Sequence, residues 1–223
     1  MATRNRAILD LPMTAQAADP TNVRALDVSR NSIHATLGDG ATPATYPVKI
    51  AGQRGYTFNG AQYMRGAAQG VFNVSAISVC ALFAPTFAAN DGAQHYLYDS
   101  SVTTEIMVVK DAVNSLVFYA GGNVVLTVAL ANFQNYWFLN GYNTLVFRGQ
   151  SGDNQAILNG YSIGTSATAW AAVNPAYYYI GCRYDATLFF AGRYYNHEVY
   201  PFAMTVIQAA DWRKRALAQL NQV

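Results

Sequence analysis

Short apolar runs separated by turn residues follow one another along most of this chain. In its second half, Leu145–Phe147 and Ile157–Leu158 flank a polar turn, and Asn159 and Gly160 come directly after them. Two apolar runs with a turn between them are typical of consecutive antiparallel strands. An Asn-Gly pair favours a two-residue type I′ turn, because both central residues adopt positive φ. We therefore predict a β-hairpin at Asn159-Gly160.

A second Asn-Gly pair, Asn59-Gly60, separates Tyr56–Phe58 from Gln62–Met64 and predicts a hairpin by the same argument. The pattern also predicts an edge strand at Ala7–Met13 and a break near Gly192 in the last strand. The remaining expected strands are Ala76–Phe83, Tyr96–Tyr98, Ile106–Val109, Ser115–Tyr119, Val124–Leu130, Thr144–Arg148, Ala156–Leu158, Tyr161–Ile163, Tyr177–Ile180 and Leu188–Tyr200. About a dozen short strands, with turn signals roughly every 8–12 residues, indicate an all-β, two-sheet antiparallel sandwich.

Helical spacing of apolar residues occurs at the C-terminus. Thr205 and Gln208 form a capping-box pair, which predicts a helix over residues 205–219 that packs on the sandwich. Neither a repeat nor a linker divides the chain. We interpret residues 1–20 as an N-terminal arm and residues 21–223 as a single domain.

The surface of this protein is poor in charge. Charged residues make up 12% of the 223 residues, hydrophobic residues make up 52%, and there are 16 tyrosines. Such a surface either meets other proteins or is a neutral surface of Ser, Thr, Asn and Gln. The net charge of +2 is too small to indicate nucleic acid or an anionic membrane as a partner.

The cell compartment is indicated by cysteine use and by the N-terminus. Cys80 and Cys182 each lie in an apolar strand, where a free thiol behaves as a small hydrophobe, so a disulfide is not required. Asp10 and Pro12 interrupt the first apolar run, so no signal-peptide core is expected. The apolar stretch Ala76–Ala89 is too short to span a bilayer. We expect synthesis in a cytoplasm.

The motifs of common hydrolases are missing. Glu105 and Glu198 are the only glutamates, and they are far apart in the sequence, whereas sandwich glucanases carry paired acids on one strand. The Gly-x-Ser-x-Gly motif is also missing. We therefore expect no enzyme activity, although an acid pair from separate strands stays open as an alternative.

Two ligand classes stay open. Asn90, Asp91 and Asp99 flank an expected loop and are either calcium ligands or ordinary turn residues; otherwise no cofactor is expected. Glycans stack on aromatic faces and need polar groups for their hydroxyls. The candidate glycan-binding residues are Trp170, Tyr177, Arg183, Tyr184 and Asp185. The alternative is that alternate tyrosines of the run Tyr177–Tyr179 are core and the others belong to an interface.

Six segments between residues 25 and 215 carry a resemblance to a known family: Tyr56–Gly60 with Tyr63, Phe72–Phe83, Ile157–Gly160, Ile180-Gly181, Phe189–Tyr200 and Met204–Ala209. Their order resembles that of the concanavalin A-like lectin/glucanase superfamily, in particular its LamG-like jelly rolls. The resemblance implies a two-sheet antiparallel jelly roll with a concave face, and it does not imply one ligand, because members of the family bind glycans, proteins or both. The calcium-binding acids of some members have no clear counterpart here. Asn143–Thr205 is similar to stand-alone LamG-like domains encoded by tailed bacteriophages.

These observations lead to three functional hypotheses. The first is a non-catalytic structural protein of a phage virion, either a capsid decoration protein or a jelly roll of the tail or fibre. It would be present in many copies, assembled in the host cytoplasm, and bound to other virion proteins, with adhesion to a host glycan left open. The second is a carbohydrate-binding lectin module. The third is a polysaccharide hydrolase or lyase.

Overall fold

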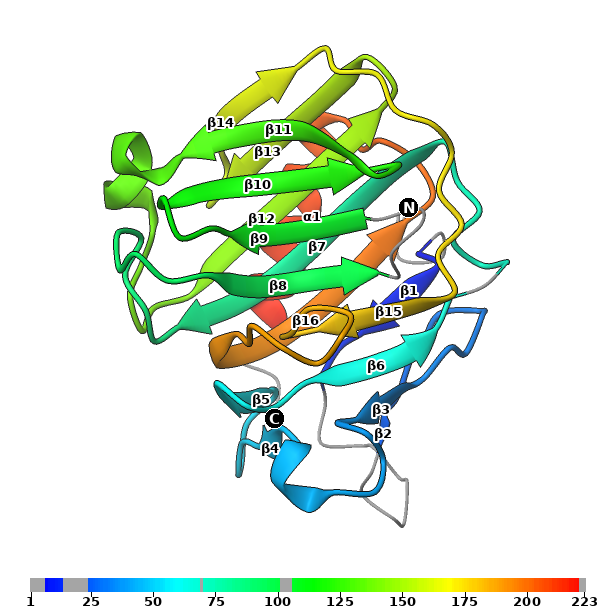
Figure 1. Cartoon of the computed structure of the whole chain (residues 1–223), viewed down its shortest axis with the longest axis vertical. Helices are drawn as coiled ribbons and strands as arrows, with labels where there is room; N and C mark the ends of the chain where they lie inside the picture. The colour runs from blue at the N-terminus through cyan, green and yellow to red at the C-terminus, as the bar shows by residue number, and fades with distance from the viewer. Residues whose placement is uncertain (1–6, 14–23, 69, 101–105, 221–223) are drawn as a thin grey trace.

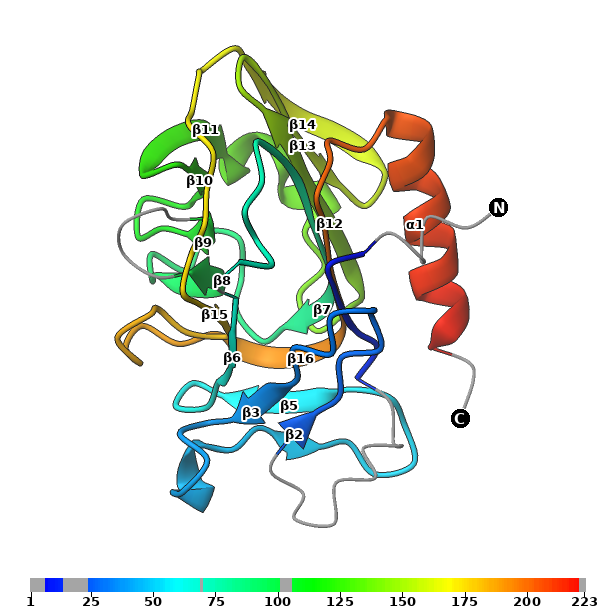
Figure 2. The same ribbon diagram turned by 90° about the vertical axis from the view of Figure 1, so that its right-hand side faces the viewer.

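The computed structural model describes residues 7–13, 24–68, 70–100 and 106–220, which form two antiparallel sheets packed face to face (Figures 1 and 2). We call the sheet beneath the C-terminal helix α1 (Val206–Gln219) the helix sheet. In spatial order it contains β14 (Tyr161–Ser166), β13 (Asp153–Leu158), β12 (Asn143–Gln150), β7 (Ala76–Pro85), β16 (Ala191–Tyr200), β5 (Tyr56–Asn59) and β4 (Val48–Lys49), with β1 (Leu9–Leu11) also paired to β16.

We call the other sheet, nearest the viewer in Figure 1, the front sheet. In spatial order it contains β11 (Asn123–Ala129), β10 (Ser115–Ala120), β9 (Ile106–Lys110), β8 (His95–Ser100), β15 (Tyr177–Ile180), β6 (Met64–Ala67), β3 (Ala35–Leu37) and β2 (Arg24–Ala25). Two short 3-10 segments, Pro43–Thr45 and Leu130–Tyr136, lie in the connections. The predicted two-sheet antiparallel jelly-roll sandwich with a C-terminal helix is confirmed.

Aromatic side chains fill the space between the sheets. Phe118 of β10 stacks on Phe147 of β12 with 4.8 Å between ring centroids, which joins the front sheet to the helix sheet. Phe83, Phe190 and Tyr194 form a second group with centroids 5.1–6.0 Å apart. Strand residues alternate between faces, so each strand contributes every second side chain to this core.

The two Asn-Gly pairs behave differently. Asn159 has φ 52° and Gly160 has φ 89°, and Leu158 pairs with Tyr161, so the hairpin between β13 and β14 is confirmed. The hairpin predicted at Asn59-Gly60 is wrong, because β5 lies in the helix sheet and the following β6 lies in the front sheet.

Local hydrogen bonds explain the second turn. The backbone N–H of Asn59 donates to Oε1 of Gln62 (3.0 Å), and Oδ1 of Asn59 accepts from the N–H of Ala61 (3.1 Å). Only Gly60 of the pair has positive φ, so the type I′ geometry is not formed. This turn carries the chain from one sheet to the other.

Helix α1 begins where the capping box predicts. Oγ1 of Thr205 accepts from the N–H of Gln208 (3.2 Å), and Oε1 of Gln208 accepts from the N–H of Thr205 (2.8 Å). The helix buries Trp212, Ala209 and Ala216 against the outer face of the helix sheet. No helix of the described part of the chain is long and apolar enough to cross a membrane.

Part of the predicted arm belongs to the sandwich. Leu9 and Leu11 are fully buried, and β1 pairs with β16 through Leu9 and Val199. Residues 1–6 and 14–20 of the predicted arm lie outside the described residues. Both cysteines, Cys80 and Cys182, are buried free thiols, in agreement with a fold that needs no disulfide.

Candidate functional site

The two sheets differ in what covers their outer faces. Helix α1 lies across the outer face of the helix sheet, as Figure 2 shows. On the opposite side of the molecule, no helix or strand of the described residues forms a further layer over the front sheet. Because no such layer covers the front sheet, the exposed part of its outer face is the natural surface on which to look for a binding site.

A row of cross-strand neighbours crosses this outer face. The register pairs Tyr179 of β15 with Arg65 of β6 on one side and with Asp99 of β8 on the other. Arg65 is in turn paired with Thr36 of β3. Directly paired residues point to the same face of a sheet, so these side chains lie together. Tyr177, two residues before Tyr179, points to this face as well.

The three tyrosines of β15 divide between the core and the surface. Tyr177 is 50% exposed, Tyr178 is fully buried, and Tyr179 is half-buried. The hydroxyl of Tyr178 donates to the carbonyl of Ile33 (2.6 Å). The ring of Tyr178 lies over Gly66 of β6, where a Cβ atom would be 2.5 Å from it. Tyr178 therefore belongs to the core, and its two neighbours are available to a ligand.

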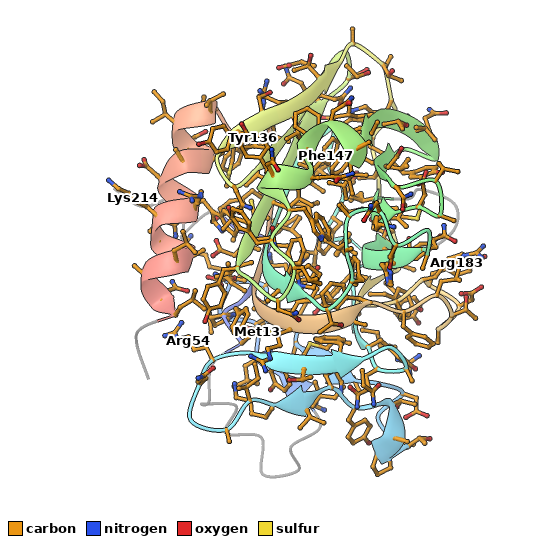
Figure 3. All side chains as sticks on the ribbon, turned by 90° about the vertical axis from the view of Figure 1, so that its left-hand side faces the viewer. Met13, Arg54, Tyr136, Phe147, Arg183 and Lys214 are labelled. Atoms are coloured by element: carbon orange, nitrogen blue, oxygen red, sulfur yellow. The ribbon has the colours of Figure 1, made fainter. Side chains whose placement is uncertain are left out.

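The connection from β15 to β16 folds back over the edge of this face. The N–H of Tyr184 donates to Oδ2 of Asp99 (2.8 Å), and the N–H of Arg183 donates to the carbonyl of Thr187 (2.9 Å). The guanidinium of Arg183 lies over the ring of Tyr184 at 5.2 Å and is 3.8 Å from Oδ2 of Asp185. Figure 3 shows Arg183 at the side of the molecule opposite Lys214 of α1. These contacts hold the loop beside Asp99 of the front sheet.

An apolar group on the same sheet adjoins these polar residues. It consists of Tyr96, Met107, Val109 and Val117, with Tyr119 packed against it. Alternation places these residues on the opposite face from the core residues Val108 and Phe118. Tyr96, Met107, Val109 and Val117 are only 2–7% exposed, so the surface that this face offers a ligand is made by the more exposed side chains of Tyr177, Tyr179 and Arg65.

The tyrosine hydroxyls of this face serve as donors at neutral pH. Burial raises the pKa of the Tyr179 hydroxyl, and the charge of Arg65 opposes that rise only in part. A protonated phenol both donates and accepts hydrogen bonds, as a sugar hydroxyl does.

Four of the five predicted site residues, Tyr177, Arg183, Tyr184 and Asp185, lie on β15 or on the loop that follows it. Trp170 does not join them, because its side chain is packed in the core. It is only 6% exposed, and its Nε1–H donates to Oδ1 of Asn154 (2.9 Å). Trp170 therefore has no exposed ring face on which a sugar could stack. Arg65, which sequence reasoning missed, enters the site because β6 pairs with β15.

The residues considered as calcium ligands do not come together. The carboxylate of Asp91 accepts from Nζ of Lys110 and from Nε2 of His95 (2.7 Å), whereas Asp99 accepts two backbone N–H groups on the front sheet. Nζ of Lys110 also donates to the carbonyl of Ala93 (2.9 Å) and to Oδ1 of Asn114 (3.0 Å). The oxygen atoms of Asp91, Ala93 and Asn114 therefore all accept hydrogen bonds from the ammonium of Lys110. Three or more metal-binding side chains converge nowhere among the described residues.

The acids considered for catalysis lie away from the open face. Glu198 is 1% exposed and faces α1, where its Oε1 accepts from Nδ2 of Asn196 (2.9 Å) and its Oε2 accepts from the hydroxyl of Tyr200. Glu105 lies outside the described residues.

Known proteins resemble this chain in structure and not in sequence. No family model matches, and no curated protein matches. Domain 4 of AbnA, a GH43 extracellular arabinanase from Geobacillus stearothermophilus in complex with arabinotriose, has a TM-score of 0.64 at 14% identity, with 92% of this chain and 97% of that chain covered.

Two botulinum neurotoxin binding domains are also similar. The serotype D domain has a TM-score of 0.69 at 10% identity, with 97% of this chain and 52% of that chain covered. The serotype DC domain in complex with SialylT has a TM-score of 0.67 at 10% identity, with 96% and 52% covered. The chain thus spans about half the length of these domains. At such identities the likeness shows the fold alone, and this fold is consistent with the resemblance to the concanavalin A-like superfamily.

Proposed function

We propose that this protein is a non-catalytic carbohydrate-binding jelly roll and that the outer face of the front sheet is its ligand surface. The observation that carries the proposal is the convergence of Tyr177, Tyr179, Arg65 and the loop Arg183–Asp185 on the sheet face that α1 leaves open. Aromatic faces with adjacent hydrogen-bonding groups suit sugars. Similar folds in complex with arabinotriose and SialylT support the same proposal.

The non-catalytic part of the proposal is supported by the positions of the acids. Glycoside hydrolysis requires two carboxyl groups that flank the scissile bond. Glu198 is buried beneath α1, Asp99 is occupied by two backbone N–H groups, and Asp185 contacts Arg183. We expect no new reducing ends when the protein is incubated with a polysaccharide that it binds; steady release would favour a hydrolase or lyase instead.

Removing both outward-facing tyrosines of β15 tests the ligand surface. For Tyr177→Ala with Tyr179→Ala, we expect at least a roughly ten-fold loss of affinity, because the aromatic surface that contacts the sugar is gone. Calorimetry with the best ligand from a glycan array measures the change. Tyr161→Ala is the matched control, since Tyr161 is 55% exposed but lies on β14 of the helix sheet. A silent array with correctly folded wild-type protein would refute the proposal.

A second candidate function places this binding module on a phage virion, as a capsid decoration protein or a tail or fibre jelly roll assembled in the host cytoplasm. The resemblance to phage-encoded domains motivates it, and an exposed apolar surface on α1 favours it. Val206 is 56% exposed and Ile207 is 74% exposed, and both are on the side opposite the front sheet (Figure 2). The protein can therefore contact other virion proteins through α1 while its ligand face stays free.

Copy number in purified particles tests the virion placement. We expect many copies per particle by quantitative mass spectrometry, and a several-fold reduction for Ile207→Glu, because a charge replaces exposed apolar contact surface. A glutamate in the first turn interacts favourably with the positive end of the helix dipole, so α1 itself is expected to remain folded. Lys214→Glu, at another exposed position of α1, is the control. Recovery of the protein only from host cytosol would exclude this placement.

A further inference from the structure

The structure assigns a preference for acidic glycans to the ligand face, with Arg65 as the residue that pairs with the carboxylate of the sugar. This inference rests on the proposed function and deepens it by naming the class of glycan. The chemical class is a carbohydrate with a carboxylate group, supplied either by a sialic acid or by a uronic acid.

Arg65 lies on β6, between β15 and β3 of the front sheet, without an acidic partner among the described residues. Its side chain is exposed, and it is flanked by Thr36 and Tyr179 in the register. No hydrogen bond or salt bridge joins it to another side chain of the described residues. Burial raises the pKa of the Tyr63 and Tyr179 hydroxyls, and the positive charge of Arg65 lowers the pKa of both by a smaller amount. The guanidinium thus lies among tyrosines.

The acids around Arg65 are already occupied. Asp99 accepts from the N–H groups of Ser100 and Tyr184 at 2.7 and 2.8 Å and is 1% exposed. Oδ1 of Asp39 accepts from the N–H groups of Ala41 and Thr42 at 2.9 and 2.7 Å. Backbone donors therefore hold both carboxylates in their own turns, and neither forms a salt bridge with Arg65, so the guanidinium keeps its N–H donors for an external anion although the charges of Asp39 and Asp99 also act on Tyr63 and Tyr179.

Asp185, the remaining acid of the face, lies next to Arg183. It accepts a hydrogen bond from Oγ1 of Thr187 (2.5 Å), and its other oxygen is 3.8 Å from the guanidinium of Arg183. Arg183 and Asp185 thus form a neutral pair at the edge of the face. Arg65 forms no salt bridge among the described residues, and its cross-strand neighbour is Tyr179, the aromatic ring on which a sugar would pack.

A guanidinium recognises a carboxylate through two parallel N–H···O bonds, which a lysine ammonium cannot reproduce. A sugar ring packed against Tyr179 brings a carboxylate substituent within reach of the cross-strand neighbour, because directly paired Cβ atoms are about 5 Å apart. A neutral sugar gains the aromatic contact alone. The affinity for an acidic glycan should also fall as salt screens the exposed charge.

Calorimetry with two matched pairs of probes tests the inference: 3′-sialyllactose against lactose, and polygalacturonate against its methyl ester. For at least one pair we expect the acid to bind about ten-fold more tightly than its neutral counterpart at low salt, with a smaller difference at high salt. Arg65→Met should abolish that difference, and Arg65→Lys should restore it only in part. Lys214→Met, on α1, should behave as wild type. The pair that shows the preference identifies the source of the carboxylate.

The outcomes separate the two proposals. Equal binding of acidic and neutral probes, or an acid preference that survives Arg65→Met in folded protein, overturns the inference and leaves the carbohydrate-binding function intact. Binding of no carbohydrate by the folded wild-type protein, on the array or with these probes, overturns both.

Discussion

Replacing His197 with phenylalanine is expected to stabilise this protein in mild acid and to remove much of its pH dependence between about pH 6.5 and 4. His197 lies on β16 and is completely buried, and neither ring nitrogen has a hydrogen-bond partner among the described residues. Its ring stacks on Tyr98 of β8, with 5.0 Å between centroids and 15° between planes. Burial lowers the pKa of the imidazole to about 3.

The direction of the effect follows from proton binding. In the unfolded chain the imidazole takes up a proton below about pH 6.5, whereas in the folded protein it stays neutral until about pH 3. The stability of wild type is therefore complete above pH 6.5 and is lost as the pH falls. The slope for one proton is about 1.4 kcal/mol per pH unit, which amounts to roughly 3 kcal/mol between pH 6.5 and 4.

Phenylalanine suits the site because the surroundings are apolar. A small cavity beside the imidazole is lined by Tyr98 and Tyr194 and by the aliphatic side chains Val79, Ala81, Leu97, Val108 and Leu145. The larger ring can use this space, and removing two unpaired buried nitrogens adds about 1–3 kcal/mol at any pH. Urea unfolding of wild type, His197→Phe and His197→Leu at pH 7, 5.5 and 4 measures both effects. Parallel pH profiles for all three proteins would contradict the prediction.

Replacing Lys110 with methionine is expected to destabilise the protein by about 3 kcal/mol, because it leaves the Asp91 carboxylate without its strongest partner. Lys110 is fully buried at the end of β9, and its ammonium joins residues 91–93 to the turn at Asn114. Methionine keeps the apolar stem of the side chain and removes the charge. Unfolding by urea at pH 7 measures the loss.

A double variant separates charge from packing. Lys110→Met with Asp91→Asn should recover part of the lost stability, because the remaining partner is then neutral. Burial raises the pKa of Asp91, but the hydrogen bonds from Lys110 and His95 outweigh it and lower the pKa overall. The contribution of the ion pair is therefore present above about pH 4 and is lost as the pH falls further. A loss below about 1 kcal/mol for the single variant would show that the pair acts like an exposed surface salt bridge.

Part of the candidate site could be predicted from the sequence. The run Tyr177–Tyr179 alternates between exposed and buried positions because strand residues alternate between faces, and the loop Arg183–Asp185 directly follows the same strand. Arg65 could not be found in this way. It reaches the site only because β6 pairs with β15, a contact between segments far apart in the sequence.

The sequence by itself determined features that depend on a few neighbouring residues. Asn159-Gly160 forms its type I′ turn because both residues adopt positive φ, and Thr205 with Gln208 begins α1 by satisfying the first N–H groups of the helix. Alternating apolar runs likewise determined the strands and the two-sheet fold.

Only the tertiary structure decided how these elements use one another. It turned Asn59-Gly60 into a passage between sheets, buried Trp170 against Asn154, and placed α1 over one sheet while leaving the other open. The physical reason is the range of the interactions. Backbone dihedral angles and capping bonds are set within a turn of chain, whereas burial and strand register depend on contacts between residues that are distant in the sequence.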